Sequence, residues 1–247
     1  MSAPTARVVL VTGAARGIGA ATVRRLVAQG DRVVAVDELA VPDDTTGNVM
    51  PVVADVRDRS ALAAAVDAAL DRWGRLDAAV AAAAVVAGGV PLWETPEADL
   101  DLLWDVDVKG VWNTAAVTVP AMLAGPDPAG ARFVAIASAA GHHGLHHLAA
   151  YNVAKHAVVG LVKGLAADLV GTGATACAVS PGSTRTPMLE ATAALYGLDD
   201  VEAFADNQLV RRVLEPDEVA ATVAFCCSRE AAVLNGSVVH ADGGFAP

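Results

Sequence analysis

The stretch VTGAARGIGAATV, residues 11–23, joins the end of an apolar run to the start of a helical pattern. Its glycines Gly13, Gly17 and Gly19 allow the backbone to turn sharply and to approach a ligand closely. A helix that begins here offers its free N–H groups to an anion such as a pyrophosphate. We therefore expect a strand, a tight turn and a helix that together form a dinucleotide site of the Rossmann type.

Short Val-rich runs alternate with helical patterns along the rest of the chain. The expected strands are 7–11, 32–36, 49–53, 76–81, 132–137, 175–179 and 237–240, and the expected helices lie near 17–28, 60–72, 97–123, 151–170 and 216–227. Strands that are apolar on both faces and separated by helices indicate a parallel sheet with right-handed crossovers. We predict one α/β domain over residues 1–247, a single-domain Rossmann-type doubly wound fold with a central parallel sheet of about seven strands and helices on both faces.

Residues 187–215 interrupt this alternation. They carry a pattern of irregular helix and loop between a strand and the last helix. Extra chain at the carboxyl ends of such strands usually shapes the ligand crevice. We therefore expect 187–215 to form a lid segment of the substrate pocket.

Bulk composition excludes several classes of function. The net charge of −11 argues against a nucleic-acid partner or an anionic membrane surface, because both need clustered Lys and Arg. The apolar run 78–90 is shorter than the roughly 18 to 20 residues of a spanning helix, so no transmembrane helix is predicted. The three cysteines lack metal-ligand spacing, and the adjacent Cys226 and Cys227 are interpreted as small core residues. A reducing, cytoplasmic compartment is expected.

An acidic residue, Asp37, ends the second expected strand in RVVAVD. A carboxylate at this position accepts hydrogen bonds from the hydroxyls of the adenine-side ribose and repels a 2′-phosphate. NAD is therefore expected in preference to NADP, with Arg16 as the residue that weakens the preference. The alternative interpretation is a tight turn followed by a surface aspartate.

Tyr151 and Lys155 lie four residues apart in AAYNVAKHAVVGLVKGL (149–165), a stretch with helical spacing of its apolar residues. The chain has only two tyrosines, so a Tyr and a Lys at this spacing stand out. Residues i and i+4 share a face of a helix, which makes the phenol and the ammonium neighbours. The pair is either catalytic or an ordinary amphipathic surface pair.

Six motifs in this order resemble those of the short-chain dehydrogenase/reductase family. They are TGAARGIG (12–19), ADV (54–56), IASAAG (136–141), YNVAK (151–155), SPGSTRT (180–186) and ADGGF (241–245). The resemblance extends from Arg7 to Phe245. It implies an NAD-dependent alcohol dehydrogenase or carbonyl reductase, and by the same resemblance a homotetramer that buries the apolar helix faces near 97–123 and 151–170.

The resemblance implies roles for the matching residues. Tyr151 is the general acid/base; its unperturbed pKa of about 10 must fall, which Lys155 and the positive nicotinamide of NAD⁺ favour. Lys155 also holds the nicotinamide ribose, and Ser138 donates to the substrate oxygen where negative charge develops. The implied contacts to NAD are Gly13, Arg16, Gly17, Ile18, Gly19, Asp37, Asp55, Val56, Ala82, Ala83, Tyr151, Lys155, Pro181, Gly182, Thr184 and Thr186.

Two positions depart from the family pattern. AAAA at 81–84 stands where the family has Asn-Asn-Ala-Gly, so either the backbone alone braces the strands or the adenosine site is looser. Asp107 stands where the family has a catalytic Asn that orders a water beside the Lys. An Asp still accepts from that water and pairs with Lys155, and its charge raises the pKa of the phenol. We expect retained but slower or pH-shifted activity.

The expected substrate pocket is mostly apolar. Its candidate residues are Trp93, Leu145, His146, Met188 and Tyr196, together with Leu189 and Leu195. They favour a hydrophobic secondary alcohol or ketone over a sugar phosphate. The histidines of GHHGLHHLAAY (141–151) are interpreted as a loop over this pocket, and no metal site is expected because no acidic or Cys partner is near.

Two alternative functions stay open. Stretches around 78–95, 137–145 and 178–198 resemble the subgroup associated with the redox peptide mycofactocin, which implies tightly held NAD re-oxidised by an external redox carrier. The insertion that would trap NAD is not evident in the short region 38–50. The second alternative is a family member that no longer catalyses and serves as a nucleotide sensor or a partner subunit. Ala81–Ala84 and Asp107 motivate this alternative, and Ser138, Tyr151 and Lys155 oppose it.

Overall fold

The computed structural model describes residues 6–41 and 46–246. These form one seven-stranded sheet, all parallel, in the order β3-β2-β1-β4-β5-β6-β7. The strands are β1 Val8–Thr12, β2 Arg32–Asp37, β3 Val49–Val53, β4 Ala78–Ala81, β5 Arg132–Ile136, β6 Thr175–Pro181 and β7 Val238–Ala241. The predicted sheet is confirmed, with strand ends displaced by up to two residues.

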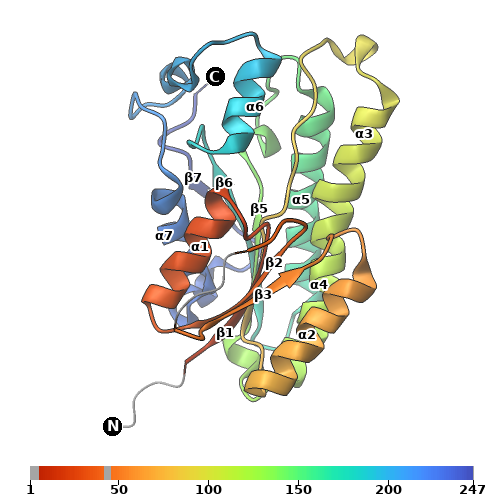
Figure 1. Cartoon of the computed structure of the whole chain (residues 1–247), viewed down its shortest axis with the longest axis vertical. Helices are drawn as coiled ribbons and strands as arrows, with labels where there is room; N and C mark the ends of the chain where they lie inside the picture. Colours follow the sequence, from red (N-terminus) through yellow and green to blue (C-terminus); the bar gives the residue numbers. More distant parts are fainter. Residues whose placement is uncertain (1–5, 42–45, 247) are drawn as a thin grey trace.

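Helices cover both faces of the sheet, as predicted (Figure 1). They are α1 Gly17–Ala28, α2 Arg59–Trp73, α3 Glu97–Leu103, α4 Gly110–Ala124, α5 Ala149–Asp168, α6 Pro187–Leu195 and α7 Pro216–Cys227. Helices α1 and α7 lie side by side on one face, and α2, α4 and α5 lie on the other. Shorter 3-10 turns lie at Leu92–Glu94, Pro128–Gly130, Ala139–Gly141, Val201–Asn207 and Arg229–Leu234.

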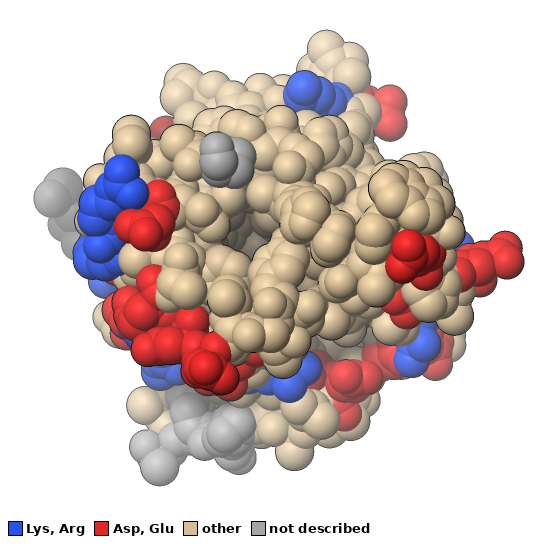
Figure 2. Space-filling view, turned by 90° about the horizontal axis from the view of Figure 1, so that it is seen from above, with Lys and Arg blue, Asp and Glu red and all other residues tan. Residues whose placement is uncertain are grey.

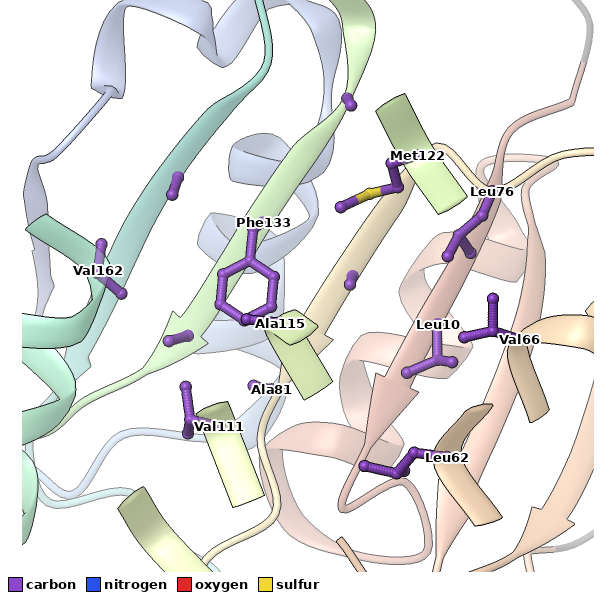
Figure 3. Close-up of a cluster of buried hydrophobic side chains, with 14 of the residues drawn as sticks. Leu10, Leu62, Val66, Leu76, Ala81, Val111, Ala115, Met122, Phe133 and Val162 are labelled. Carbon is purple, nitrogen blue, oxygen red and sulfur yellow. The ribbon is translucent and has the colours of Figure 1, made fainter. Parts of the chain in front are cut away.

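The strand residues alternate between two hydrophobic cores. On β1, Leu10 packs into the core under α2, α4 and α5, whereas Val9 and Val11 pack into the core under α1 and α7. Figure 3 shows the first of these cores, with Phe133 of β5 among the buried aliphatic side chains. Because both faces are buried, the strands read as continuous apolar runs. The cysteines Cys177, Cys226 and Cys227 are buried in the second core. For Cys226 and Cys227 this confirms the interpretation as small core residues.

The stretch 97–123 is not one regular helix, which corrects the prediction. A π-helical turn, Trp104–Lys109, lies between α3 and α4. A π turn inserts one residue relative to an α-helix and is frequent at functional sites. Apolar spacing alone does not reveal such an insertion, because α3 and α4 keep the same general direction on either side (Figure 1).

The region after β6 contains helix α6 and the turn Val201–Asn207. Thr186 caps α6 by accepting from the N–H of Leu189 at 3.3 Å. Residues 207–210 then pair with the C-terminal segment 243–246 through three backbone hydrogen bonds of 2.9–3.1 Å. No helix of the described ranges has the length and apolarity needed to cross a membrane.

The strand order reverses between β1 and β4, which are neighbours although β2 and β3 intervene in sequence. The two crossovers leave this point in opposite directions, so a crevice opens above the carboxyl ends of β1 and β4. The fold therefore places the glycine-rich turn after β1 and the segment after β4 beside one crevice.

Candidate active site

A cavity of about 930 Å³ opens at the carboxyl ends of the strands. Figure 2 shows it from above as a hollow surrounded mainly by uncharged residues. Its lining contains the sequence-predicted cofactor residues and most of the predicted substrate residues. Three predicted residues do not line it: Asp107, which lies behind Lys155, Trp93 and Leu195.

The glycine-rich turn forms one wall of the cavity. Gly13 has a φ of +68°, and a Cβ there would lie 2.7 Å from the backbone nitrogen of Ala83. A Cβ on Gly19 would lie 1.9 Å from the carbonyl oxygen of Gly13. Both positions therefore require glycine. The N-terminus of α1, with Arg16, Gly17 and Ile18, faces the cavity and presents the helix N–H groups that an anion would use.

Asp37 closes the cavity at the end of β2. Its Oδ2 accepts from the N–H of Ala15 at 2.9 Å, and its Oδ1 accepts from the N–H of Leu39 at 2.9 Å. These bonds fix the carboxylate beside the glycine-rich turn and leave lone pairs free toward the cavity. Asp55 and Val56 line the same end. A side-chain hydrogen bond from Arg57 lowers the pKa of the Asp55 carboxyl, so the negative charge there persists.

Thr12 braces the segment Ala81–Ala84, where the family pattern has asparagines. Its Oγ1 accepts from the N–H of Ala82 at 3.1 Å and from the N–H of Ala83 at 3.3 Å. The backbone of this segment is thus held by a side chain on the neighbouring strand. Sequence reasoning missed Thr12; its position as the last residue of β1, in register with Ala81 of β4, is the signal that identifies it.

Ser138, Tyr151 and Lys155 meet in the cavity. Ser138 follows β5, and Tyr151 and Lys155 lie one turn apart on α5. The Lys155 Nζ lies 5.4 Å from the centre of the Tyr151 ring. The Tyr151 hydroxyl points toward the Met188 Sδ, 3.8 Å away, at the start of α6. The predicted proximity of the phenol and the ammonium is confirmed.

Asp107 forms a buried ion pair with Lys155. The Asp107 Oδ2 lies 3.0 Å from the Lys155 Nζ, and neither residue is more than 2% exposed. Asp107 Oδ1 accepts from the N–H of Val85 at 2.9 Å, and Lys155 donates to the carbonyl of Ile136 at 3.4 Å. The π-helical turn carries Asp107, so the irregularity in the helix delivers the carboxylate to the lysine.

The charges of Asp107 and Lys155 affect the pKa of Tyr151. Burial raises the pKa of the Tyr151 phenol, Lys155 and a hydrogen bond with Ser138 oppose the rise, and Asp107 adds to it. Burial lowers the pKa of the Lys155 ammonium, but Asp107 and Tyr151 outweigh it and the net direction is upward. Burial raises the pKa of the Asp107 carboxyl against the pull of Lys155. Lys155 therefore keeps its charge, and the carboxylate reduces its effect on the phenol.

The segment after β6 borders the middle of the cavity. Pro181, Gly182, Thr184 and Thr186 all line it. A Cβ on Gly17 would lie 3.2 Å from the Thr186 Cγ2, so this segment reaches across to the glycine-rich turn. Gly182 is packed against Asp242, whose carbonyl oxygen a Cβ would approach to 2.6 Å.

Five of the seven predicted substrate residues, Leu145, His146, Met188, Leu189 and Tyr196, line the cavity. Leu195 instead packs against a neighbouring hydrophobic cluster. Trp93 does not line the cavity either: it lies on the exposed turn Leu92–Glu94 and is 81% exposed, so its assignment to the pocket is wrong. No motif in the sequence determines the path of the loop after β4. In the structure, that path carries Trp93 away from the cavity. Sequence reasoning also missed Phe204, Asn207 and Phe245, which line the cavity from 201–207 and the C-terminal segment.

The histidines at 142–147 do not share one environment. His142 packs against the ring of His240 with centroids 4.7 Å apart, and His146 stacks on His147 at 3.6 Å. Only His146 of the four histidines at 142–147 lines the cavity. In the described ranges, no group of three or more His, Cys, Asp or Glu side chains is arranged to hold a metal ion.

Comparison with known proteins gives consistent matches over nearly the whole chain. A family model described as enoyl-(acyl carrier protein) reductase matches residues 13–246. The oxidoreductase UcpA of Escherichia coli K12 is 34% identical, with 97% of this chain and 94% of the relative covered. A γ-butyrolactone 1′-reductase of Streptomyces virginiae is 35% identical over 98% of this chain and 96% of its own. The crystal structure of levodione reductase superposes with a TM-score of 0.87 at 30% identity, covering 96% of both chains.

Proposed function

The chain belongs to the short-chain dehydrogenase/reductase family, and from this premise we propose that it is an NAD-dependent oxidoreductase that interconverts a neutral, hydrophobic secondary alcohol and its ketone. Tyr151 is the general acid/base in this proposal. The reductases named for a γ-butyrolactone and for levodione support carbonyl reduction as the class of reaction.

One observation carries the proposal: Ser138, Tyr151 and Lys155 share a cavity with the glycine-rich turn and Asp37. A carbonyl oxygen beside these residues accepts a hydrogen bond from the Ser138 hydroxyl and a proton from the Tyr151 hydroxyl. In the reverse direction the Tyr151 phenolate takes the proton of an alcohol. Lys155 favours that phenolate by its charge.

The residues of the cavity fit a dinucleotide. A Cβ would fill the cradle at Gly13, and the N–H groups of α1 face the space that a pyrophosphate needs. Gly13, Gly17 and Gly19 would hold the pyrophosphate, Asp37 and Asp55 the adenosine, and Lys155 and Thr186 the nicotinamide side. When bound, NAD supplies or accepts the hydride. The carboxylate of Asp37 favours NAD over NADP, because it would repel a 2′-phosphate.

The convergence of three reactive side chains favours an enzyme over a nucleotide sensor without turnover. No feature of the described residues favours the mycofactocin-coupled alternative, and part of the region 38–50 on which it depends, residues 42–45, lies outside them. We also propose a cytoplasmic homotetramer. Trp104, Trp112 and Val153 are 42–63% exposed on the helices that such an assembly would cover.

The decisive experiment compares the purified protein with Tyr151→Phe in ketone reduction by NADH. The variant keeps the ring and loses the proton that the reaction needs, so turnover should fall by about 10²–10⁴-fold. Binding of NADH and the thermal unfolding temperature should be retained. A variant that keeps most of its turnover would overturn the assignment of Tyr151, and absence of turnover in both proteins with a broad set of ketones and alcohols would overturn the enzyme itself.

A further inference from the structure

Aromatic side chains are scarce in this chain, but several line the cavity. Three of them, Tyr196, Phe204 and Phe245, come from the lid and C-terminal segments and define what we call its aromatic end. Both tyrosines and two of the four phenylalanines, Phe204 and Phe245, line it. The other two phenylalanines lie elsewhere: Phe133 is buried in the core and Phe225 is 51% exposed on α7. All four tryptophans lie outside the lining, so the aromatic part of the cavity wall comes from Tyr and Phe alone.

Tyr196 and Phe204 approach from the lid segment 187–215. Their ring centroids are 6.1 Å apart and their planes are inclined by 52°, within the range of an attractive aromatic pair. Tyr196 directly follows α6 and Phe204 lies in the turn Val201–Asn207, and these two elements pack against one another in a small hydrophobic cluster. The lid therefore presents a preformed aromatic surface to the cavity.

Phe245 reaches the cavity because of the turn that follows β7. Gly243 and Gly244 have φ values of +64° and +76°, and the N–H of Gly244 donates to the Asp242 Oδ1 at 2.9 Å. The chain then pairs with the lid, where the N–H of Ala246 donates to the carbonyl of Asn207 at 2.9 Å. This pairing fixes the backbone on both sides of Phe245, whose ring lies 5.7 Å from that of His143.

Charged groups are absent from this end among the described lining residues. The charged residues of the lining are Arg16, Asp37, Glu38, Asp55, Arg57 and Lys155. The first five belong to the β1, β2 and β3 side of the sheet, whereas the C-terminal segment follows β7 at the opposite edge. A charged substrate would lose its hydration at the aromatic end without gaining a partner.

We propose that the substrate carries a neutral ring, alicyclic or aromatic, on its reacting carbon, and that this ring lies between the Tyr196–Phe204 pair and Phe245. The inference rests on the proposed function and adds the substrate class. Aromatic faces contact a flat or compact ring over a larger area than a flexible chain, and a ring loses less conformational entropy on binding. Phe245 is the specificity-determining residue that the C-terminal segment supplies.

The test uses methyl ketones of equal carbon number, acetophenone, cyclohexyl methyl ketone and 2-octanone, with NADH. We expect kcat/KM to favour both ring ketones over 2-octanone by about tenfold or more, which corresponds to ~1.4 kcal/mol. Phe245→Leu should lower kcat/KM for the two ring ketones more than for 2-octanone, so that most of the preference is lost. Phe225→Leu, the same change outside the cavity, should leave the preference intact.

Equal or better use of 2-octanone overturns the ring assignment while the proposed function stands. Should no ketone turn over, the proposed function fails, and the same ketones are then compared by saturation-transfer NMR on the protein with NAD. Stronger binding of the ring ketones that Phe245→Leu weakens still supports the inference, and equal binding of all three overturns it.

Discussion

Lys155 and Asp107 form an ion pair of 3.0 Å inside the protein, where the family pattern has an asparagine in place of the aspartate. Both side chains are buried, so water screens their interaction little. An uncharged amide would leave the full charge of Lys155 to act on Tyr151. The carboxylate instead offsets part of that charge and raises the pKa of the phenol. In the proposed reaction, the pKa of Tyr151 therefore depends on a carboxylate that does not line the cavity.

Replacement of Asp107 by Asn should shift the pH dependence of turnover to lower pH. The change removes an influence that raises the pKa of Tyr151, so the phenolate forms at lower pH. Alcohol oxidation needs the phenolate, so its rise with increasing pH should begin at a lower pH than in the unmodified protein. Ketone reduction needs the phenol, so its decline with increasing pH should also begin at a lower pH. Profiles of kcat/KM in both directions measure the shift.

Asp105→Asn is the matched control for that experiment. Asp105 lies on the same π-helical turn but pairs with Lys109 at the surface, where the side chains are 43% and 58% exposed. Its replacement should leave both pH profiles unchanged. Coincident profiles of Asp107→Asn and the unmodified protein would assign Asp107 a purely structural role, and a shift to higher pH would mean that Lys155 loses its proton without the carboxylate.

Asp37→Asn should relax the preference for NAD over NADP. The variant keeps an acceptor for the N–H of Ala15 and removes the charge that would face a 2′-phosphate. The ratio of kcat/KM for NADPH to that for NADH should rise by about tenfold or more, or ~1.4 kcal/mol. Asp67→Asn removes the same charge from the exposed face of α2 and should not alter the ratio. An unchanged ratio in Asp37→Asn would show that another residue selects the cofactor.

The sheet could be predicted from sequence because its strands are buried on both faces. Runs such as VVLVT and RVVAVD have no polar alternation, and each is followed by a helical pattern, so the parallel doubly wound arrangement is the consistent solution. The π-helical turn could not be predicted, since one inserted residue changes neither composition nor apolar spacing enough to be recognised. The turn carries Asp107, whose ion-pair partner Lys155 lies on α5, so the contact that it makes joins distant parts of the chain.

The residues of the candidate site also differ in whether the sequence predicts them. Gly13, Asp37, Tyr151 and Lys155 belong to local motifs whose spacing reflects one turn or one helix, and the structure brings them to one cavity. Phe245 depends on two left-handed glycines and on pairing with a segment more than thirty residues earlier, which no local pattern encodes. Residue type alone places Trp93 in the pocket, but the path of the loop after β4 leaves it exposed outside the cavity.

Thr12→Val should destabilise the protein and weaken NAD binding. Thr12 is 1% exposed, and its Oγ1 is the acceptor for the N–H groups of Ala82 and Ala83, which line the cavity. Valine has the same shape but no acceptor, so the cost should be about 1–3 kcal/mol in the free energy of unfolding. Thr12→Ser keeps the hydroxyl and should lose less stability than Thr12→Val. Urea unfolding and NAD titration measure both effects; equal stability of the two variants would contradict this role of the hydroxyl.

The loop before α5 is held by three successive carbonyls. The Leu145 carbonyl accepts from Asn152 of α5 at 3.0 Å, and the His147 carbonyl accepts from the N–H of Gly89 at 2.8 Å. The carbonyl between them, that of His146, accepts from the Tyr196 hydroxyl at 2.5 Å. Two of these bonds fix the loop to the body of the fold, and the third joins it to the lid.

Tyr196→Phe should therefore loosen the lid without disturbing the loop. The ring stays beside Phe204, and only the bond to His146 is lost, at a cost of about 0.5–1.5 kcal/mol. Hydrogen exchange should quicken about two- to tenfold in α6 but not in α5, and KM for the ketone should rise by a similar factor while the pH profile stays unchanged. Faster exchange in α6 would show that the Tyr196 hydroxyl holds the lid to the loop. A higher KM with unchanged exchange in α6 would contradict this role, because the hydroxyl would then act on the bound substrate itself.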